Sequence, residues 1–183
     1  RIWTEALAEA VHTTPDRVAL HSVHQHNAPF VDHVGNALLA QTGQSPPLFD
    51  PRFFDELVRR SASAVRDALN QAVPVTHIRT GQAEVSQVAS NRRIIGPNGK
   101  IRFVRYSANN PPEVRDAPEG TIDPVLRSIS FYRQDQPLAR LYYYTTHPMS
   151  YYGDGRVTSD FVGIARDRRD RNEPGVLHVY LTG

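Results

Sequence analysis

The strongest constraint on the fold is a change near residue 75 from helix-forming to strand-forming sequence. Before it, Asp50 and Pro51 are suited to the N-cap and first position of a helix, and apolar residues recur at helical spacing until about Asn70. After it come strand-length runs separated by turn signals, at 75–88, 100–106, 125–133, 138–146 and 176–181. This order predicts an α/β (mixed α+β) fold, with layered mixed β-sheets flanked by helices.

The remaining segments complete this outline. Helices are expected at 2–11, near 34–40, and from Ser159-Asp160 to about residue 170. A short buried strand is expected at 17–23, a hairpin turn at 96–99 and a polar surface loop at 107–121. No internal boundary is visible, so we predict a single, partial domain over 1–183. Because the chain starts without Met inside an expected helix, we expect a fragment of a larger catalytic domain.

Composition excludes several classes of function. Hydrophobic residues make up 39% of the chain, enough for a core, but no run approaches the ~18 apolar residues of a membrane span, so no transmembrane segment is expected. The net charge is +2 and the basic residues are interspersed with acids, which argues against a nucleic-acid partner. Cysteine is absent, so any metal must bind to His, Asp, Glu or Tyr.

Three histidines stand at the ends of expected strands. His24 and His26 follow the strand at 17–23, and side chains two residues apart on a strand project from the same side. His147 follows the strand at 138–146 and precedes Pro148, which favours an extended conformation for it. Imidazole nitrogens are common zinc ligands, so the pattern predicts a metal site. The histidines without such a pattern are expected to be structural: His12, His33, His77 and His178.

Several familiar hydrolase patterns are missing. The chain has no His-Glu-x-x-His helix and no His-x-His-x-Asp-His segment. An amidohydrolase barrel would need eight βα units, which the expected hairpins contradict. Neither a Gly-x-Ser-x-Gly elbow nor a glycine-rich phosphate loop is present.

Four segments resemble, in order, the motifs of neutral/alkaline (non-lysosomal) ceramidases. Residues 23–29, Val-His-Gln-His-Asn-Ala-Pro, are similar to the family's Thr-His-Thr-His-Ser-(Gly/Ala)-Pro. Residues 89–93 resemble its Asn-Arg-Ser motif, and 146–150 its Val-His-Pro-Thr-Ser motif. Residues 159–165 resemble its Ser-Gly-Asp-Asn-x-Gly-x-Ala helix start, so the resemblance spans most of the chain.

The resemblance implies a zinc (Zn²⁺) amidase domain that cleaves the C–N bond of a small-molecule or lipid amide such as a sphingolipid. It implies that His24 and His147 bind zinc, and that His26 and Arg92 hold substrate oxygens. A glutamate and a tyrosine beyond Gly183 are expected to complete the zinc ligands. Zinc would lower the pKa of a bound water to about 7 and stabilise developing negative charge. The resemblance also implies an extracytoplasmic location, secreted or periplasmic.

The chain departs from the family pattern at two places. Val23, Gln25 and Asn27 stand where the family has Thr, Thr and Ser. The family's site serine falls on Gly183, or on Thr182 if the alignment slips by one residue. The substrate therefore stays open.

Other interpretations remain. The chain could be a metallohydrolase of the same fold acting on a non-lipid amide or ester, or a non-catalytic ligand-binding domain, and the histidines could merely satisfy a polar core. Arg92 could pair with a surface acid instead of substrate. Asp160 is expected to cap a helix rather than to bind metal. The sequence does not predict an oligomeric state.

Overall fold

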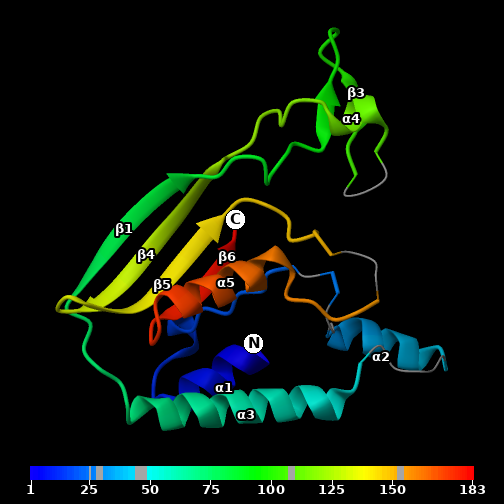
Figure 1. The fold of residues 1–183 in the computed structure, drawn as a ribbon. Coiled ribbons are helices and arrows are strands. Elements are labelled where there is room, and N and C mark those ends of the chain that lie inside the picture. The colour runs from blue at the N-terminus through cyan, green and yellow to red at the C-terminus, as the bar shows by residue number, and fades with distance from the viewer. Residues whose placement is uncertain (25, 28–30, 44–48, 107–109, 152–154) are drawn as a thin grey trace. The chain divides into compact units, whose positions relative to one another are not determined.

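The computed structural model describes residues 1–24, 26–27, 31–43, 49–106, 110–151 and 155–183. The chain divides into two compact units (Figure 1). Unit 1 comprises residues 1–21 and 28–74, and unit 2 comprises residues 22–27 and 75–183. The single domain expected over 1–183 stays a prediction. None of the helices in the described part of the chain is both long and apolar enough to cross a membrane.

Unit 1 is helical. Its elements are α1 (Ile2–Ala10), the 3₁₀ helix η1 (Pro15–Arg17), α2 (His33–Gln41) and α3 (Pro51–Leu69). The start of α3 is as the sequence predicts, because the carboxylate of Asp50 accepts a hydrogen bond from the backbone N–H of Arg52. Phe54 of α3 is buried, with Trp3 edge-on at 6.1 Å and His33 at 4.5 Å between ring centroids. His33 therefore has a packing role, as expected.

Unit 2 is built on a mixed four-stranded sheet of order β1-β4-β5-β6. These strands are β1 (His77–Glu84), β4 (Val125–Arg133), β5 (Gln136–Tyr144) and β6 (Leu177–Thr182). β1, β4 and β5 are successively antiparallel, whereas β6 is parallel to β5. Helix α5 (Asp160–Asn172) connects β5 to β6 and lies against the sheet (Figure 1), where Val162 packs with Tyr144 and Tyr180. The α/β prediction is confirmed.

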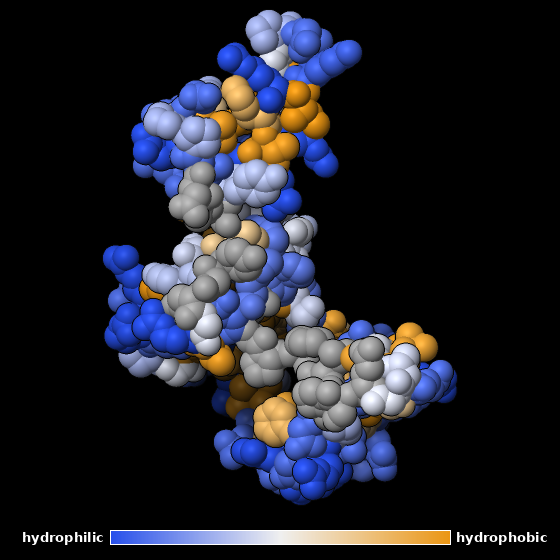
Figure 2. All heavy atoms as spheres, turned by 90° about the vertical axis from the view of Figure 1, so that its right-hand side faces the viewer, coloured by the Kyte–Doolittle hydropathy of each residue, from blue (hydrophilic) through white to orange (hydrophobic). Residues whose placement is uncertain are grey.

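A second, two-stranded sheet follows β1 in unit 2. β2 (Arg93–Ile95) and β3 (Ile101–Val104) are antiparallel and are joined through the expected turn, where Gly99 has a φ of +73° that glycine adopts without strain. Apolar side chains gather over this hairpin (Figure 2), and Ile95 and Ile101 are 57% and 52% exposed.

The loop expected at 107–121 contains a short helix, α4 (Pro112–Arg115). Val114 of α4 is only 3% exposed, so the expectation of a surface loop is wrong for this part. A proline in the first turn favours the helical conformation, and burial of Val114 stabilises it. Residues 107–109 of the expected loop lie outside the described residues.

The strand expected at 17–23 does not form. Arg17 ends η1, and residues 18–24 join no sheet. The local sequence favours a strand, but a strand also needs a neighbour that pairs with its backbone, and this segment has none among the described residues. Val23 nevertheless packs against the core cluster of unit 2, as an apolar residue should.

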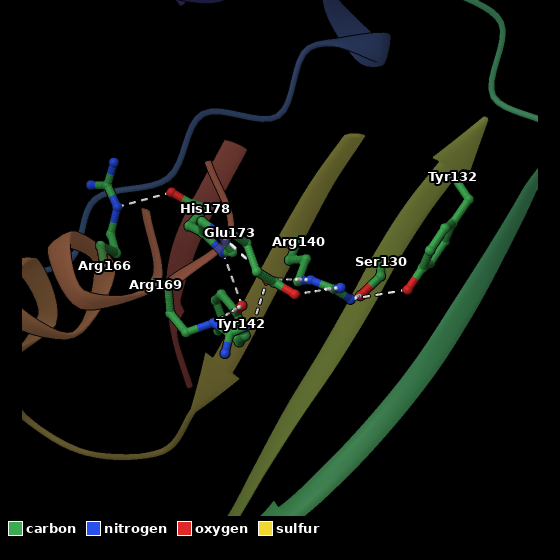
Figure 3. Close-up of polar contacts among 8 residues, drawn as sticks. All are labelled: Ser130, Tyr132, Arg140, Tyr142, Arg166, Arg169, Glu173 and His178. Carbon is green, nitrogen blue, oxygen red and sulfur yellow. Dashed lines mark hydrogen bonds and ion pairs between the residues drawn. The ribbon is translucent and has the colours of Figure 1, made fainter. Parts of the chain in front are cut away.

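A charged network joins α5 to the sheet (Figure 3). Glu173, the residue after α5, accepts two hydrogen bonds of 2.9 Å from the guanidinium of Arg140 and is also paired with Arg169. Arg169 donates to the hydroxyl of Tyr142, which lies 2.9 Å from Nδ1 of the buried His178. The hydrogen bonds from Arg140 hold the pKa of Glu173 below its usual value, while desolvation and the charge of Arg169 lower the pKa of His178.

Replacing Glu173→Gln should destabilise unit 2. The change removes the negative charge that two partly buried guanidinium groups face, and we expect the free energy of unfolding at neutral pH to fall by about 2 kcal/mol. Because the folded-state pKa of Glu173 is lowered, its stabilisation is present above its usual pKa of 4.5 and is lost as the pH falls through the folded-state value. Wild type and variant should therefore converge in acid, as measured by urea unfolding at several pH values.

The matched control is Glu9→Gln, at an exposed position of α1 outside the network. It should change the free energy of unfolding by no more than about 0.5 kcal/mol. Equal stability of Glu173→Gln and wild type at neutral pH would contradict the role given to this carboxylate.

Candidate metal centre

Three histidines of unit 2 face one another. The ring centroid of His24 lies 5.1 Å from that of His26 and 4.8 Å from that of His147. The Nε2 atoms of His26 and His147 are 2.7 Å apart. One nitrogen of each ring lies within 4.8 Å of the others, and all three residues are exposed. Within the described residues, no other group of three or more His, Cys, Asp or Glu side chains converges in this way.

The first two histidines approach each other because the chain turns, not because a strand alternates. His24 has a φ of 51°, in the left-handed region that costs a non-glycine residue about 1–3 kcal/mol and that therefore needs support from its surroundings. Val23 packs into the core just before this turn. Just after it, Asn27 donates to the carbonyl of Tyr151 at 2.6 Å and accepts from the N–H of Thr158 at 3.0 Å. Residues 25, 28 and 29 of the motif lie outside the described residues.

The parallel strands of unit 2 bring the third histidine to the same place. Tyr144 of β5 pairs with Thr182 of β6, so the carboxyl ends of both strands lie at one edge of the sheet, where α/β proteins commonly bind ligands. His147 lies in the segment that follows β5. It lines a pocket of about 320 Å³ together with His24, Thr182 and Gly183. Both positions considered for the family's serine therefore line the pocket beside the histidines.

Asp160 fixes the loop that follows His147. Asp160 is 4% exposed, and its carboxylate accepts hydrogen bonds from the backbone N–H groups of Ser150 and Tyr151, both at 3.2 Å, and of Phe161 at 2.6 Å. It is not part of the histidine group, and it is the first residue of α5 rather than the cap that the sequence suggested, since the N-cap is Ser159. Ser159, at the N-cap, makes no capping bond with its side chain. Sequence analysis missed the link from Asp160 back to Ser150 and Tyr151, because it joins residues of different elements.

The electrostatics favour a neutral imidazole at His147. Desolvation lowers the pKa of His147, and the nearby His26, His24 and Arg92 lower it further, against a smaller opposing effect of Asp160. A neutral imidazole presents a nitrogen lone pair, which a metal ligand requires. At 2.7 Å, one Nε2–H of His26 or His147 donates to the other Nε2. A metal ion between these two nitrogens would replace that proton.

Arg92 lines a second and larger pocket of about 590 Å³, to which His147 also belongs. Among the described residues, its guanidinium makes no ion pair or hydrogen bond, so the suggested pairing with a surface acid is not seen there. The structure thus brings Arg92 and the three histidines to adjoining pockets. Sequence analysis overlooked Arg105 in this wall, although it directly follows β3, the strand after the hairpin turn.

The other histidines are elsewhere. His77 stacks on Tyr132 with ring centroids 5.0 Å apart, and His178 is buried beside Tyr142. Neither belongs to the histidine group.

Comparison with known proteins adds no relative. No protein-family model matches the chain, and no curated protein matches it significantly. The resemblance to neutral ceramidases therefore depends on the four short motifs alone.

Changing Asp160→Asn should loosen the loop that carries His147. The amide keeps the size of the carboxylate but replaces one acceptor oxygen by a donor, so one of the backbone N–H groups loses its partner. We expect the free energy of unfolding to fall by about 1–3 kcal/mol. Amide hydrogen exchange should become faster at Ser150 or Tyr151. Asp135→Asn, in the exposed β4–β5 turn, is the control and should change neither quantity. Unchanged exchange in Asp160→Asn would show that this carboxylate does not hold the loop.

Proposed function

We propose that the chain carries the metal-binding part of a zinc-dependent hydrolase of neutral ceramidase type, which cleaves a C–N amide bond. The observation that carries this proposal is the convergence of His24 and His26 with His147, since 121 residues separate His26 from His147. The motif resemblance supports an amide as substrate, with lipid amides first. It also supports an extracytoplasmic location.

The three histidines suit a zinc ion. Two imidazole nitrogens bound to one zinc at about 2.0–2.1 Å in tetrahedral geometry lie about 3.3 Å apart. The distance of 2.7 Å between the Nε2 atoms of His26 and His147, and the 4.8 Å within which all three ligand nitrogens lie, bracket that value. Small side-chain rotations would bring them to it. Imidazole also suits copper and nickel, and we favour zinc because the resemblance implies it.

The site residues have separate roles in this proposal. His24 and His147 would hold the ion, which when bound would supply an activated water and polarise the substrate carbonyl. His26 faces His147. It either holds a substrate oxygen, as the resemblance implies, or provides a third nitrogen ligand to the ion. The guanidinium of Arg92 is available to donate hydrogen bonds to the carbonyl oxygen as negative charge develops there. Asn27 and Asp160 hold the two histidine segments in position.

The second candidate is a metallohydrolase of the same fold that acts on a non-lipid amide or ester. The polar, arginine-lined pocket that includes His147 favours it, because the polar part of a ceramide carries no charge for such a wall to bind. Hydrolysis of short N-acyl amides but not of ceramide would select this candidate.

Zinc content tests the proposal. We expect about one zinc per chain in the intact parent protein, lost in both His24→Asn and His147→Ala. Asparagine is chosen at position 24 because it tolerates the left-handed backbone, so the loss reflects the ligand rather than strain. His26→Ala should keep zinc and lose amidase activity if His26 holds substrate, and should lose zinc if it is a ligand. Elemental analysis of purified protein gives the answer.

The matched control is His77→Phe, which keeps an aromatic ring stacked on Tyr132 away from the centre and should retain zinc. A parent protein without zinc, or zinc content indifferent to both ligand changes, would refute the metallohydrolase. A non-catalytic ligand-binding domain, or histidines that only satisfy one another, would then explain the cluster.

A further inference from the structure

The larger pocket beside the histidines is lined by arginines. Its volume is about 590 Å³, and it is formed within unit 2 by residues from 87–92, 105–106, 110–115 and 146–150, with Phe161. His147 is part of this wall, so a molecule bound in the pocket touches the candidate metal centre. Whatever group the wall recognises must therefore lie close to the bond that is cleaved.

The charged side chains of the wall are cations. Arg92, Arg105 and Arg115 line it, and none of the described residues that line it is acidic. Arg115 is neutralised by Asp116, whose carboxylate accepts two hydrogen bonds from it at 2.7 and 3.1 Å. The remaining two guanidinium groups have no carboxylate partner among the described residues.

Arg105 is fixed in place without being neutralised. Its guanidinium donates to the backbone carbonyls of Val114, Ala117 and Pro118 at 3.0, 2.6 and 3.1 Å. These bonds use Nε and Nη2, which leaves the two N–H groups of Nη1 for another acceptor. Carbonyl oxygens carry no net charge, so Arg105 keeps its full positive charge in a rigid position.

Besides Asp116, two acids contact residues of the wall, and both do so through backbone N–H groups. Glu119 accepts from the N–H of Gln87 at 2.8 Å, and Asp160 accepts from the N–H of Ser150 at 3.2 Å. Neither carboxylate is paired with Arg92 or Arg105 in the described part of the chain. An anion that enters the pocket therefore finds two guanidinium groups with donors to offer.

We propose that this pocket binds a carboxylate of the substrate, so that the substrates are N-acyl amino acids rather than neutral sphingolipid amides. The inference rests on the proposed function of the neighbouring histidines. A carboxylate matches the planar donor pair of a guanidinium. In an N-acyl amino acid one carbon separates the α-carboxylate from the amide nitrogen, which suits a pocket that adjoins the histidines. Water adds across the C–N bond and gives a carboxylic acid and a free amino acid, with no change in oxidation state.

Two probes of equal size test the proposal on the intact parent protein. N-decanoylglycine carries the carboxylate, and N-decanoylglycinamide replaces it with a neutral amide. Calorimetric titration of zinc-free protein should show about 10-fold tighter binding of the acid, because a charge-assisted pair is lost in the amide. With zinc restored, kcat/KM should favour the acid by a similar factor.

Arg105→Gln should reduce the preference for the acid while leaving the affinity for the neutral amide unchanged. A merely structural role would weaken binding of both probes equally. The matched control is Arg102→Gln. Arg102 lies in β3, which ends just before Arg105, but it is not part of the pocket wall, so this variant should keep the preference for the acid.

The outcomes separate this inference from the proposed function. Equal affinity of the two probes, a preference that depends on zinc, or an equal effect of Arg102→Gln would overturn the carboxylate pocket. Hydrolysis of both probes at equal rates would retain the amidase and reject the pocket. Arginine-dependent binding of the acid without hydrolysis of either probe would retain the pocket and reject the amidase.

Discussion

The parallel pairing of β5 with β6 is the constraint on which the candidate centre depends. Strands that run in the same direction end at the same edge, so the segment carrying His147 and the segment ending in Thr182 and Gly183 meet there. The crossover helix α5 starts from this edge as well, which lets Asp160 bind the backbone of the loop after His147. An antiparallel β6 would place its carboxyl end at the opposite edge and leave the pocket with one wall fewer.

The candidate centre also depends on the left-handed conformation of His24. Such a backbone is unfavourable for a histidine in isolation, and it persists because Val23 and Asn27 are held on either side of it. Asn27 reaches the carbonyl of Tyr151 with its side-chain amide and so anchors the turn that presents His24 and His26.

Local sequence predicted those elements whose signals are themselves local. Asp50-Pro51 marks the start of α3, and the turn at 96–99 marks the β2–β3 hairpin, because capping and turn chemistry act within a few residues. The strand expected at 17–23 failed because pairing depends on a distant partner. The grouping of His24, His26 and His147 followed from motif order, whereas the binding of Asp160 to two distant N–H groups left no signal in sequence. The role of Arg105 left no signal in the sequence either, because it depends on the backbone carbonyls that surround its guanidinium.

The arginines of unit 2 divide into two kinds according to their partners, and this division bears on specificity. Arg140 and Arg169 share the carboxylate of Glu173, so they stabilise the contact between α5 and the sheet and have little charge left for a ligand. Arg92 and Arg105 meet no carboxylate among the described residues. A cation with its own carboxylate contributes to folding, whereas one that meets only carbonyls or solvent gains most from an incoming anion. Arg92 and Arg105 lie beside the histidines, and this position argues for a charged substrate over a neutral lipid.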